Sequence, residues 1–153
     1  MRGLLLWGLL LAGQAQACDS LGLENHNPGN LRPAHWQNST GAIGVDPWGH
    51  AIYKNDFDGL LACRKNVRAY GRRYHIKTVR AFVTRWIGPG NARTRHGALV
   101  LREYCQILKT TPDASLSLTH KATALRVTHA VVRMENGCDP YPEALYEQVF
   151  REP

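Results

Sequence analysis

The sequence predicts a mainly α-helical domain of the α+β class, with a small hairpin and an irregular segment near the N-terminus. Between positions 56 and 136, apolar residues recur at three- and four-residue steps, the spacing of amphipathic helices. Residues 24–50 are instead rich in Asn, Gly, Pro and Trp, which is typical of turns. The 153 residues show no repeat or long linker, so we expect one domain with one core over residues 18–153.

The N-terminal segment is organised like a secretory signal peptide. Met1-Arg2 supplies a positive charge, Leu4–Leu11 is a short apolar run, and Ala15-Gln16-Ala17 is a small-residue cleavage site. The run is too short to span a bilayer, and no later run could form a transmembrane helix. We therefore expect residues 1–17 to be removed and the mature chain to reach the periplasm or the exterior. Lipidation of Cys18 is the alternative, although the Leu that usually stands three residues before a lipidated cysteine is missing.

The four cysteines fit an oxidising compartment. None stands in a Cys-x-x-Cys pair, the spacing of many zinc and redox sites, and an even number favours two disulfides. Four cysteines allow three connectivities. We favour Cys18–Cys138, which would join the two ends of the mature chain, and Cys63–Cys105, which would join two helices.

The first regular elements expected are a hairpin and a long helix. Residues 41–53 can form a short hairpin, because Asp46-Pro47-Trp48-Gly49 is a turn signal. Helical periodicity begins after Asp56. Its apolar positions are Phe57, Leu60, Leu61, Val67, Tyr70 and Tyr74.

Two further helices are bounded by turn residues. The segment 78–86 begins at a threonine that can cap a helix, and it stops before Gly88-Pro89-Gly90. The segment 94–108 carries an apolar stripe and ends before Thr111-Pro112-Asp113.

Residues 117–136 predict the central helix of the fold. Two apolar stripes cover most of its circumference, so we expect it to be buried on most sides. Glu135 lies in its last turn, before the helix-breaking Asn136-Gly137, and points along a largely apolar side. Burial and the negative end of a helix both favour the protonated form of a carboxyl group, and glycosidic-bond cleavage requires such an acid. Pairing with Arg133, Arg126 or a helix-capping donor in an ordinary semi-buried salt bridge is the alternative.

Short motifs spread over the mature chain carry a family resemblance. They are Asn27-Pro28-Gly29-Asn30-Leu31-Arg32, Trp36, Ala51-Ile52-Tyr53, Gly59-Leu60-Leu61-Ala62, Thr84-Arg85-Trp86-Ile87-Gly88-Pro89-Gly90-Asn91 with Thr94, Glu135-Asn136-Gly137 and Pro140-Tyr141. The first resembles the Asn-Pro-Gly-Asn-Ile/Leu-Arg signature of a family of phage-associated and bacterial proteins. Members are often labelled virion structural proteins, and they resemble peptidoglycan-cleaving, lysozyme-like domains. The resemblance implies a mainly α, lysozyme-like α+β domain with a cleft that acts on cell-wall glycan strands.

The resemblance also implies which carboxyl group acts. Lysozyme-like enzymes tend to place their acid at the end of a buried helix before small residues, and Glu135-Asn136-Gly137 is similar. Here that helix comes late in the chain, which would require a circular permutation. Relatives often carry Glu-Asn where this chain has Gly90-Asn91; if that acid assists catalysis in them, it is missing here. Glu24, just before the signature, is a second catalytic candidate or a partner of Arg32.

Other residues are candidates for binding the substrate. Asn27 and Asn30 could present amide groups to sugars, or could instead build the turn around Pro28-Gly29. Arg32 could contact a wall carboxylate or lactyl group. The expected substrate-binding residues are Asn27, Asn30, Arg32, Trp48, Asn91 and Tyr141.

Aromatic and acidic residues have both binding and structural interpretations. Trp48 lies in a turn and is the favoured platform for stacking on sugars, whereas core packing is favoured for Trp86. Asp46 and Asp56 could supply a second carboxylate, but turn and cap roles are favoured. Without a second acid, a lytic transglycosylase mechanism is favoured, in which one carboxyl group serves as acid and then as base.

Composition narrows the classes of function. A formal net charge of +7 draws the protein towards polyanions, so association with the cell envelope through a basic surface is possible. Nucleic-acid binding would rest on charge alone, and we expect none. The seven histidines lack a metal-ligand spacing, and no nucleotide-binding motif occurs, so we expect no metal or cofactor. The sequence thus predicts an exported peptidoglycan-cleaving enzyme, with a non-catalytic wall-binding or virion structural protein as the alternative.

Overall fold

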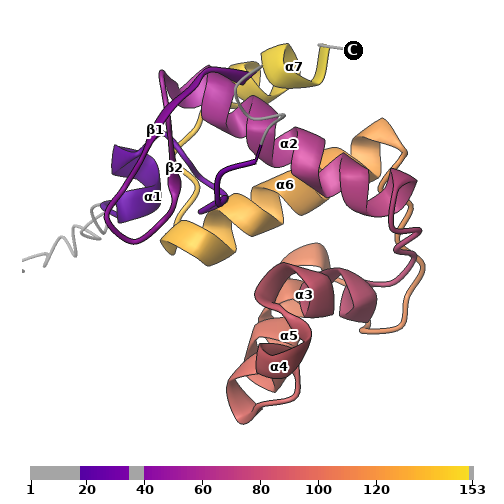
Figure 1. Cartoon of the computed structure of the whole chain (residues 1–153). Helices are drawn as coiled ribbons and strands as arrows, with labels where there is room; N and C mark the ends of the chain where they lie inside the picture. The colour runs from indigo at the N-terminus through magenta and orange to yellow at the C-terminus, as the bar shows by residue number, and fades with distance from the viewer. Residues whose placement is uncertain (1–17, 35–39, 152–153) are drawn as a thin grey trace, which may run out of the picture.

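The computed structural model describes residues 18–34 and 40–151, and it has the mainly helical α+β fold predicted from the sequence (Figure 1). The expected signal peptide and Trp36 lie outside the described residues. The helices are α1 (Leu21–Glu24), α2 (Asp56–Arg72), α3 (Val79–Ile87), α4 (Pro89–Ala92), α5 (Arg95–Leu108), α6 (Lys121–Asn136) and α7 (Glu143–Arg151), and the strands are β1 (Ala42–Val45) and β2 (Ala51–Tyr53). The prediction of fold class is confirmed.

Strands β1 and β2 form the expected antiparallel hairpin, with Val45 opposite Ala51. Asp46 closes the turn, because its Oδ1 accepts hydrogen bonds from the backbone N–H groups of Trp48 (2.9 Å) and His50 (2.8 Å). The backbone of β2 also donates hydrogen bonds to the segment before the hairpin. The hairpin is therefore fixed against the segment that carries the Asn-Pro-Gly-Asn motif.

Helices α2 and α6 pack against each other at the centre of the molecule (Figure 1). Helix α2 is capped by Asn55, whose side chain accepts a hydrogen bond from the N–H of Asp58 (2.9 Å). Helix α6 begins at Lys121 instead of Ser117, because the residues between them form a turn. Leu118 in this turn is still buried, so the apolar pattern that predicted a longer helix continues past its end.

Helices α3, α4 and α5 form a group on one side of the α2–α6 pair (Figure 1). Thr78 and Thr94 cap α3 and α5, since their hydroxyl groups accept hydrogen bonds from the N–H groups of Ala81 (3.2 Å) and Gly97 (3.1 Å). Gly88 ends α3 with a φ of 86°, which few residues other than glycine adopt. The short α4 that follows was not expected from the sequence.

Helices α1 and α7 were not expected either. Helix α1 is a single turn capped by Ser20. Helix α7 packs against α2 and buries Tyr146, Val149 and Phe150, which share one helical face. Like the other helices in the described part of the chain, neither is long and apolar enough to cross a membrane.

One of the two expected disulfides is present. Cys18 and Cys138 are bonded, and they tie the residues before α1 to the residues after α6. The second expected pairing is wrong, because Cys63 and Cys105 are both free and buried. They face different neighbours: the Cys63 thiol lies against Gly29, whereas Cys105 lies on α5 near Arg80. Burial raises the pKa of the Cys63 thiol and of the Cys105 thiol, so both behave as packing groups.

Candidate functional site

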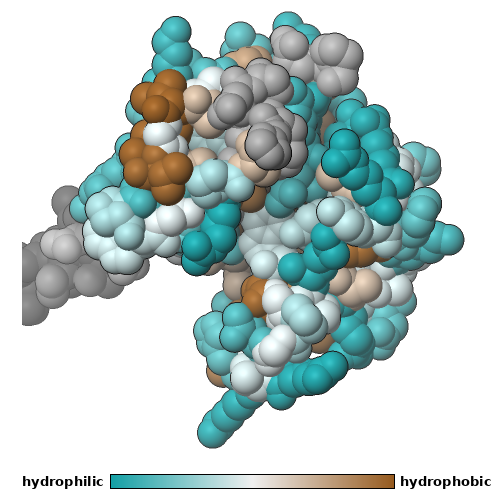
Figure 2. Space-filling view, viewed as in Figure 1, coloured by the Kyte–Doolittle hydropathy of each residue, from teal (hydrophilic) through white to brown (hydrophobic). Residues whose placement is uncertain are grey.

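A cleft of about 510 Å³ lies between the hairpin side of the molecule and the α3–α4 side. The space-filling view shows the surface hollowed between these two parts (Figure 2). Residues from the N-terminal segment, the hairpin, α2, α3, α4 and α6 line it: Gly29, Asn30, Leu31, Arg32, His50, Asn66, Tyr70, Trp86, Ile87, Asn91 and Glu135. Segments far apart in the sequence thus meet at one site.

Glu135 lines this cleft and is half-buried, and each of its carboxyl oxygens accepts a hydrogen bond. The indole Nε1 of Trp86 donates to Oε1 at 2.7 Å. The side-chain amide of Asn30 donates to Oε2 at 3.0 Å. Two neutral donors from opposite sides of the cleft therefore fix the orientation of the carboxyl group.

The end of α6 is held by the residue that follows Glu135. The Asn136 amide donates to the carbonyl groups of Pro28 and Val132, both at 2.8 Å. Its Oδ1 accepts a hydrogen bond from the Ser20 hydroxyl at 2.6 Å. The last turn of α6 is thereby joined to the N-terminal segment that supplies Asn30.

Glu135 forms no salt bridge within the described part of the chain. The sequence left open a pairing with Arg126 or Arg133. Arg126 instead donates to the carbonyl of Leu108 at 2.6 Å, and Arg133 is exposed. The carboxyl group is therefore not neutralised by either of these guanidinium groups.

Glu135 is the one acidic side chain among the described residues that line the cleft. Asp46 lies under the hairpin turn, where burial raises its pKa, but hydrogen bonds from His50, Asn25 and Trp48 together lower the pKa below its ordinary value. Asp56 lies in the first turn of α2, with its Oδ1 2.6 Å from the Nδ1 of His26. Neither aspartate reaches the cleft.

The two asparagines of the signature motif have different surroundings. Asn27 is fully buried, and its amide donates to the carbonyl groups of Leu31 (2.9 Å) and Ala51 (2.8 Å), so it holds the turn. Asn30 faces the cleft with a φ of 46°, a conformation that asparagine tolerates better than most residues. The turn thus presents one asparagine to Glu135 and uses the other to build itself.

Two of the other expected binding residues line the cleft, and two lie elsewhere. Arg32 lines it with its guanidinium group beside Gly49, and Asn91 lines it while its amide donates to the carbonyl of Ile87 at 2.7 Å. Trp48 is exposed at the tip of the hairpin and is not among the lining residues. Tyr141 packs against Tyr146 and is not among the lining residues either.

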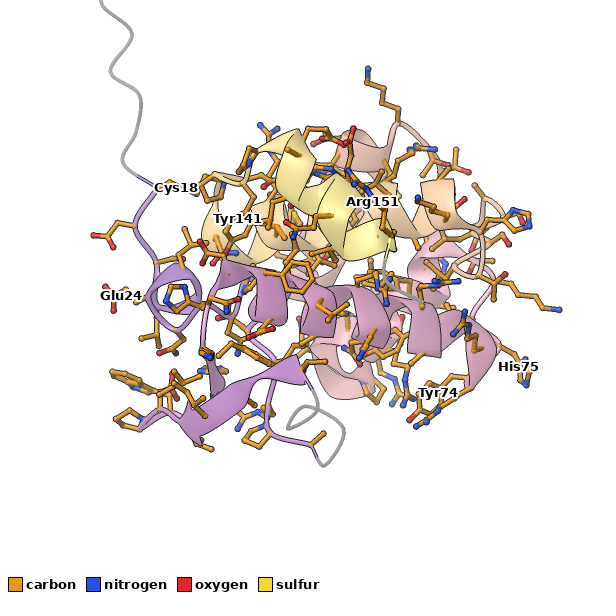
Figure 3. All side chains as sticks on the ribbon, turned by 90° about the horizontal axis from the view of Figure 1, so that it is seen from above. Cys18, Glu24, Tyr74, His75, Tyr141 and Arg151 are labelled. Atoms are coloured by element: carbon orange, nitrogen blue, oxygen red, sulfur yellow. A yellow bond between two sulfur atoms is a disulfide. The ribbon has the colours of Figure 1, made fainter. Side chains whose placement is uncertain are left out.

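Glu24, the other catalytic candidate, is the last residue of α1 and is exposed. It lies at the outer edge of the molecule, on the same side as Cys18 (Figure 3). It is not among the residues that line the cleft. The structure therefore places only one of the two candidate acids in a substrate-sized space.

Sequence reasoning missed three residues around Glu135. Trp86 was expected in the core; it stacks on Phe82, with ring centroids 5.6 Å apart, but also presents its N–H to the carboxyl group. Asn66 and Tyr70 line the cleft from α2. Residues on α2 and α3 alternate between core and cleft within a turn, which apolar periodicity alone does not resolve.

No protein-family model matches this sequence, and no curated protein matches it. The cleft offers one oriented carboxyl group, several amide groups, the guanidinium group of Arg32 and an aromatic wall. The amide groups and the aromatic rings suit a hydroxyl-rich ligand.

Proposed function

We propose that this protein is an exported enzyme that cleaves the glycan strands of peptidoglycan, with Glu135 as its acid and base. The observation that carries the proposal is a single carboxyl group in a cleft, oriented by Trp86 and Asn30 and paired with no cation among the described residues. The cleft of about 510 Å³ lies within the roughly 300–1,000 Å³ range of small-molecule sites. Such a space suits two or three sugar rings.

A single acid favours a lytic transglycosylase over a hydrolase. Hydrolytic enzymes generally use a second carboxylate to activate water or to attack the sugar. Glu135 would instead donate its proton to the glycosidic oxygen as the C1–O bond breaks. It would then accept the proton of the C6 hydroxyl of the same muramic acid residue as that oxygen attacks C1. The products are a free 4-hydroxyl group and a 1,6-anhydro ring, no water is consumed, and Glu135 regains its proton.

Export is supported by two features. The Cys18–Cys138 disulfide is a kind of bond that persists in oxidising compartments. The predicted leader 1–17 ends directly before the first of these cysteines. Both favour the periplasm or the exterior, where peptidoglycan is found.

The test is digestion of purified peptidoglycan, followed by mass spectrometry of the released muropeptides. The wild type should give anhydro ends, which are lighter by one water than hydrolytic ends. Glu135→Gln should lower the rate by about 10²–10⁴-fold, because the amide keeps the shape and loses the transferable proton. Thermal unfolding should show that this variant is folded.

The matched control is Glu103→Gln, the same change at an exposed residue of α5 outside the cleft, which should keep full activity. Loss of activity in Glu24→Gln alone would move the acid to Glu24. Hydrolytic ends would establish a muramidase instead of a transglycosylase. Wall binding without any cleavage by the wild type would leave only the non-catalytic alternative.

A further inference from the structure

A second pocket, of about 700 Å³, lies on the other side of Tyr70 from the Glu135 cleft. It is lined by Tyr70, Tyr74, Ile76, Thr78, Arg80, Ala81, Thr84, Arg85 and Pro89. Tyr70 belongs to both spaces, so its ring forms their shared wall. A ligand that occupies the cleft could therefore extend past Tyr70 into this pocket.

Arg85 is held in this pocket by aromatic rings. Its guanidinium carbon lies 3.3 Å from the centroid of the Tyr74 ring and 5.1 Å from that of Tyr70. Stacking fixes the plane of a guanidinium group but does not use its N–H donors, which lie in that plane. No described residue forms a salt bridge with Arg85. The pocket thus contains an oriented cation that can still bind an anion.

Arg80, in the same pocket, is different because it is already paired. Its Nε and Nη2 donate to the two carboxylate oxygens of Asp113, each at 2.8 Å. This two-point geometry is the one in which arginine binds carboxylates most effectively. Arg85 carries the same guanidinium group but has no carboxylate partner in the part of the chain that the structure describes.

The surroundings of the pocket are cationic and its walls are partly apolar. Arg72, Arg73 and Lys77 are exposed on the segment that also carries Tyr74 and Ile76. Tyr74 and His75 lie at the opposite end of the molecule from Glu24 (Figure 3). Burial raises the pKa of Tyr70, although the Arg85 guanidinium lowers it, so the shared wall is neutral at neutral pH.

We propose that this pocket binds the peptide stem of peptidoglycan while the glycan strand lies in the Glu135 cleft. The inference rests on the proposed function. Wall peptides branch from the glycan, carry free carboxylates and contain small apolar side chains. Arg85 would bind one stem carboxylate through two N–H groups, and the apolar wall of the pocket would accept an alanine methyl group. The protein would therefore distinguish stem-bearing strands from bare glycan.

The experiment compares cleavage of glycan strands that carry their stems with strands from which an amidase has removed them. The wild type should prefer stem-bearing strands. Arg85→Gln should lower that preference by about tenfold or more, the effect of one lost hydrogen-bonded charge pair. Arg85→Lys should keep only part of it, because an ammonium group neither stacks flat nor binds at two points. Arg102→Gln, on the exposed face of α5 and outside both pockets, is the matched control.

A second measurement tests peptide binding by this pocket independently of the proposed enzyme activity. Binding of a synthetic stem peptide with free carboxylates is titrated by NMR, with the wild type and Arg85→Gln at equal thermal stability. If the protein cleaves no glycan but binds the peptide through Arg85, the result would support stem binding by the pocket and contradict only the proposed enzyme activity. Equal cleavage of both strand types, with no peptide binding, would overturn the proposal that the pocket binds the peptide stem. The proposed enzyme activity would not be affected.

Discussion

At the scale of single residues, Trp86 helps to orient the carboxyl group of Glu135. An indole N–H has one direction, and here it points to Oε1 at 2.7 Å. The same ring stacks on Phe82 and lies edge-on to Tyr70, so its position is fixed by packing on other sides. Trp86 therefore acts as a positioning residue for the acid, a role that a core tryptophan without a polar partner does not have.

Trp86→Phe tests this role because phenylalanine keeps the stacking and removes the donor. We expect the turnover rate on glycan strands to fall by about 10- to 100-fold, because the indole N–H would stabilise the carboxylate that forms as Glu135 gives up its proton. A hydrogen bond to such a charged group contributes about 1.5–3 kcal/mol. KM should change little if the ring still lines the cleft. Trp48→Phe, at the exposed hairpin tip, should keep the turnover rate. An equal loss in both variants would contradict a specific role for Trp86.

At the scale of elements, helix α2 can reach the N-terminal turn only because position 59 is glycine. A Cβ atom at Gly59 would meet the backbone carbonyl of His26, which cannot rotate away as a side chain could. Gly59→Ala should therefore lower the free energy of unfolding by about 1–3 kcal/mol or more, as measured by urea denaturation. Gly90→Ala is the control, because nothing lies within 4 Å of the Cβ atom that it would add. Equal stability of the two variants would show that the two segments separate without cost.

The hairpin depends on a buried carboxylate. Burial raises the pKa of Asp46, but hydrogen bonds from His50, Asn25 and Trp48 lower it below the ordinary value, so the charged form stabilises the fold. This contribution is complete above the ordinary pKa of about 3.9 and is lost as the pH falls through the lower folded value. Asp46→Asn should be less stable than the wild type at neutral pH, and the difference should shrink below about pH 4.

Urea unfolding as a function of pH measures this effect. Glu147→Gln, at an exposed position of α7, provides a control that should follow the wild-type curve closely. A constant difference between Asp46→Asn and the wild type across the acid range would mean that shape, and not charge, makes Asp46 important.

At the scale of the whole molecule, the sequence located the longer helices α2, α3, α5 and α6 but missed α7, and it did not show where the helices contact one another. Periodicity and caps located the hairpin, α2, α3, α5 and α6 to within a few residues. The missed α1 and α4 are single turns, too short to show a period. Glu135 stood out because it is acidic within an apolar helix, whereas its partner Trp86 lies 49 residues away in the sequence. Contacts of that kind depend on how helices pack, which local patterns do not specify.

The pairing of the cysteines also depends on how the helices pack, so it was only partly predicted from the sequence. It provides a direct test of the fold. An even number of cysteines favoured two bonds, but only Cys18 and Cys138 face each other, while Cys63 and Cys105 are free and buried. Alkylation of the unreduced protein in denaturant, followed by peptide mass spectrometry, should label Cys63 and Cys105 alone. Without denaturant, both should be protected, because buried thiols with raised pKa values react slowly.

Removing the Cys18–Cys138 disulfide should lower both stability and activity, although neither cysteine lines the cleft. It closes a loop with a sequence separation of 120, so Cys18→Ser with Cys138→Ser should lower the free energy of unfolding by about 2–5 kcal/mol. Activity should fall as well, because the same end of α6 is tied to Ser20 through Asn136, next to the acid. Reductant should reproduce both effects in the wild type and do nothing further in the double variant. Labelling of no cysteine in the denatured, unreduced wild type would show that Cys63 and Cys105 pair after all, and that α2 and α5 pack differently.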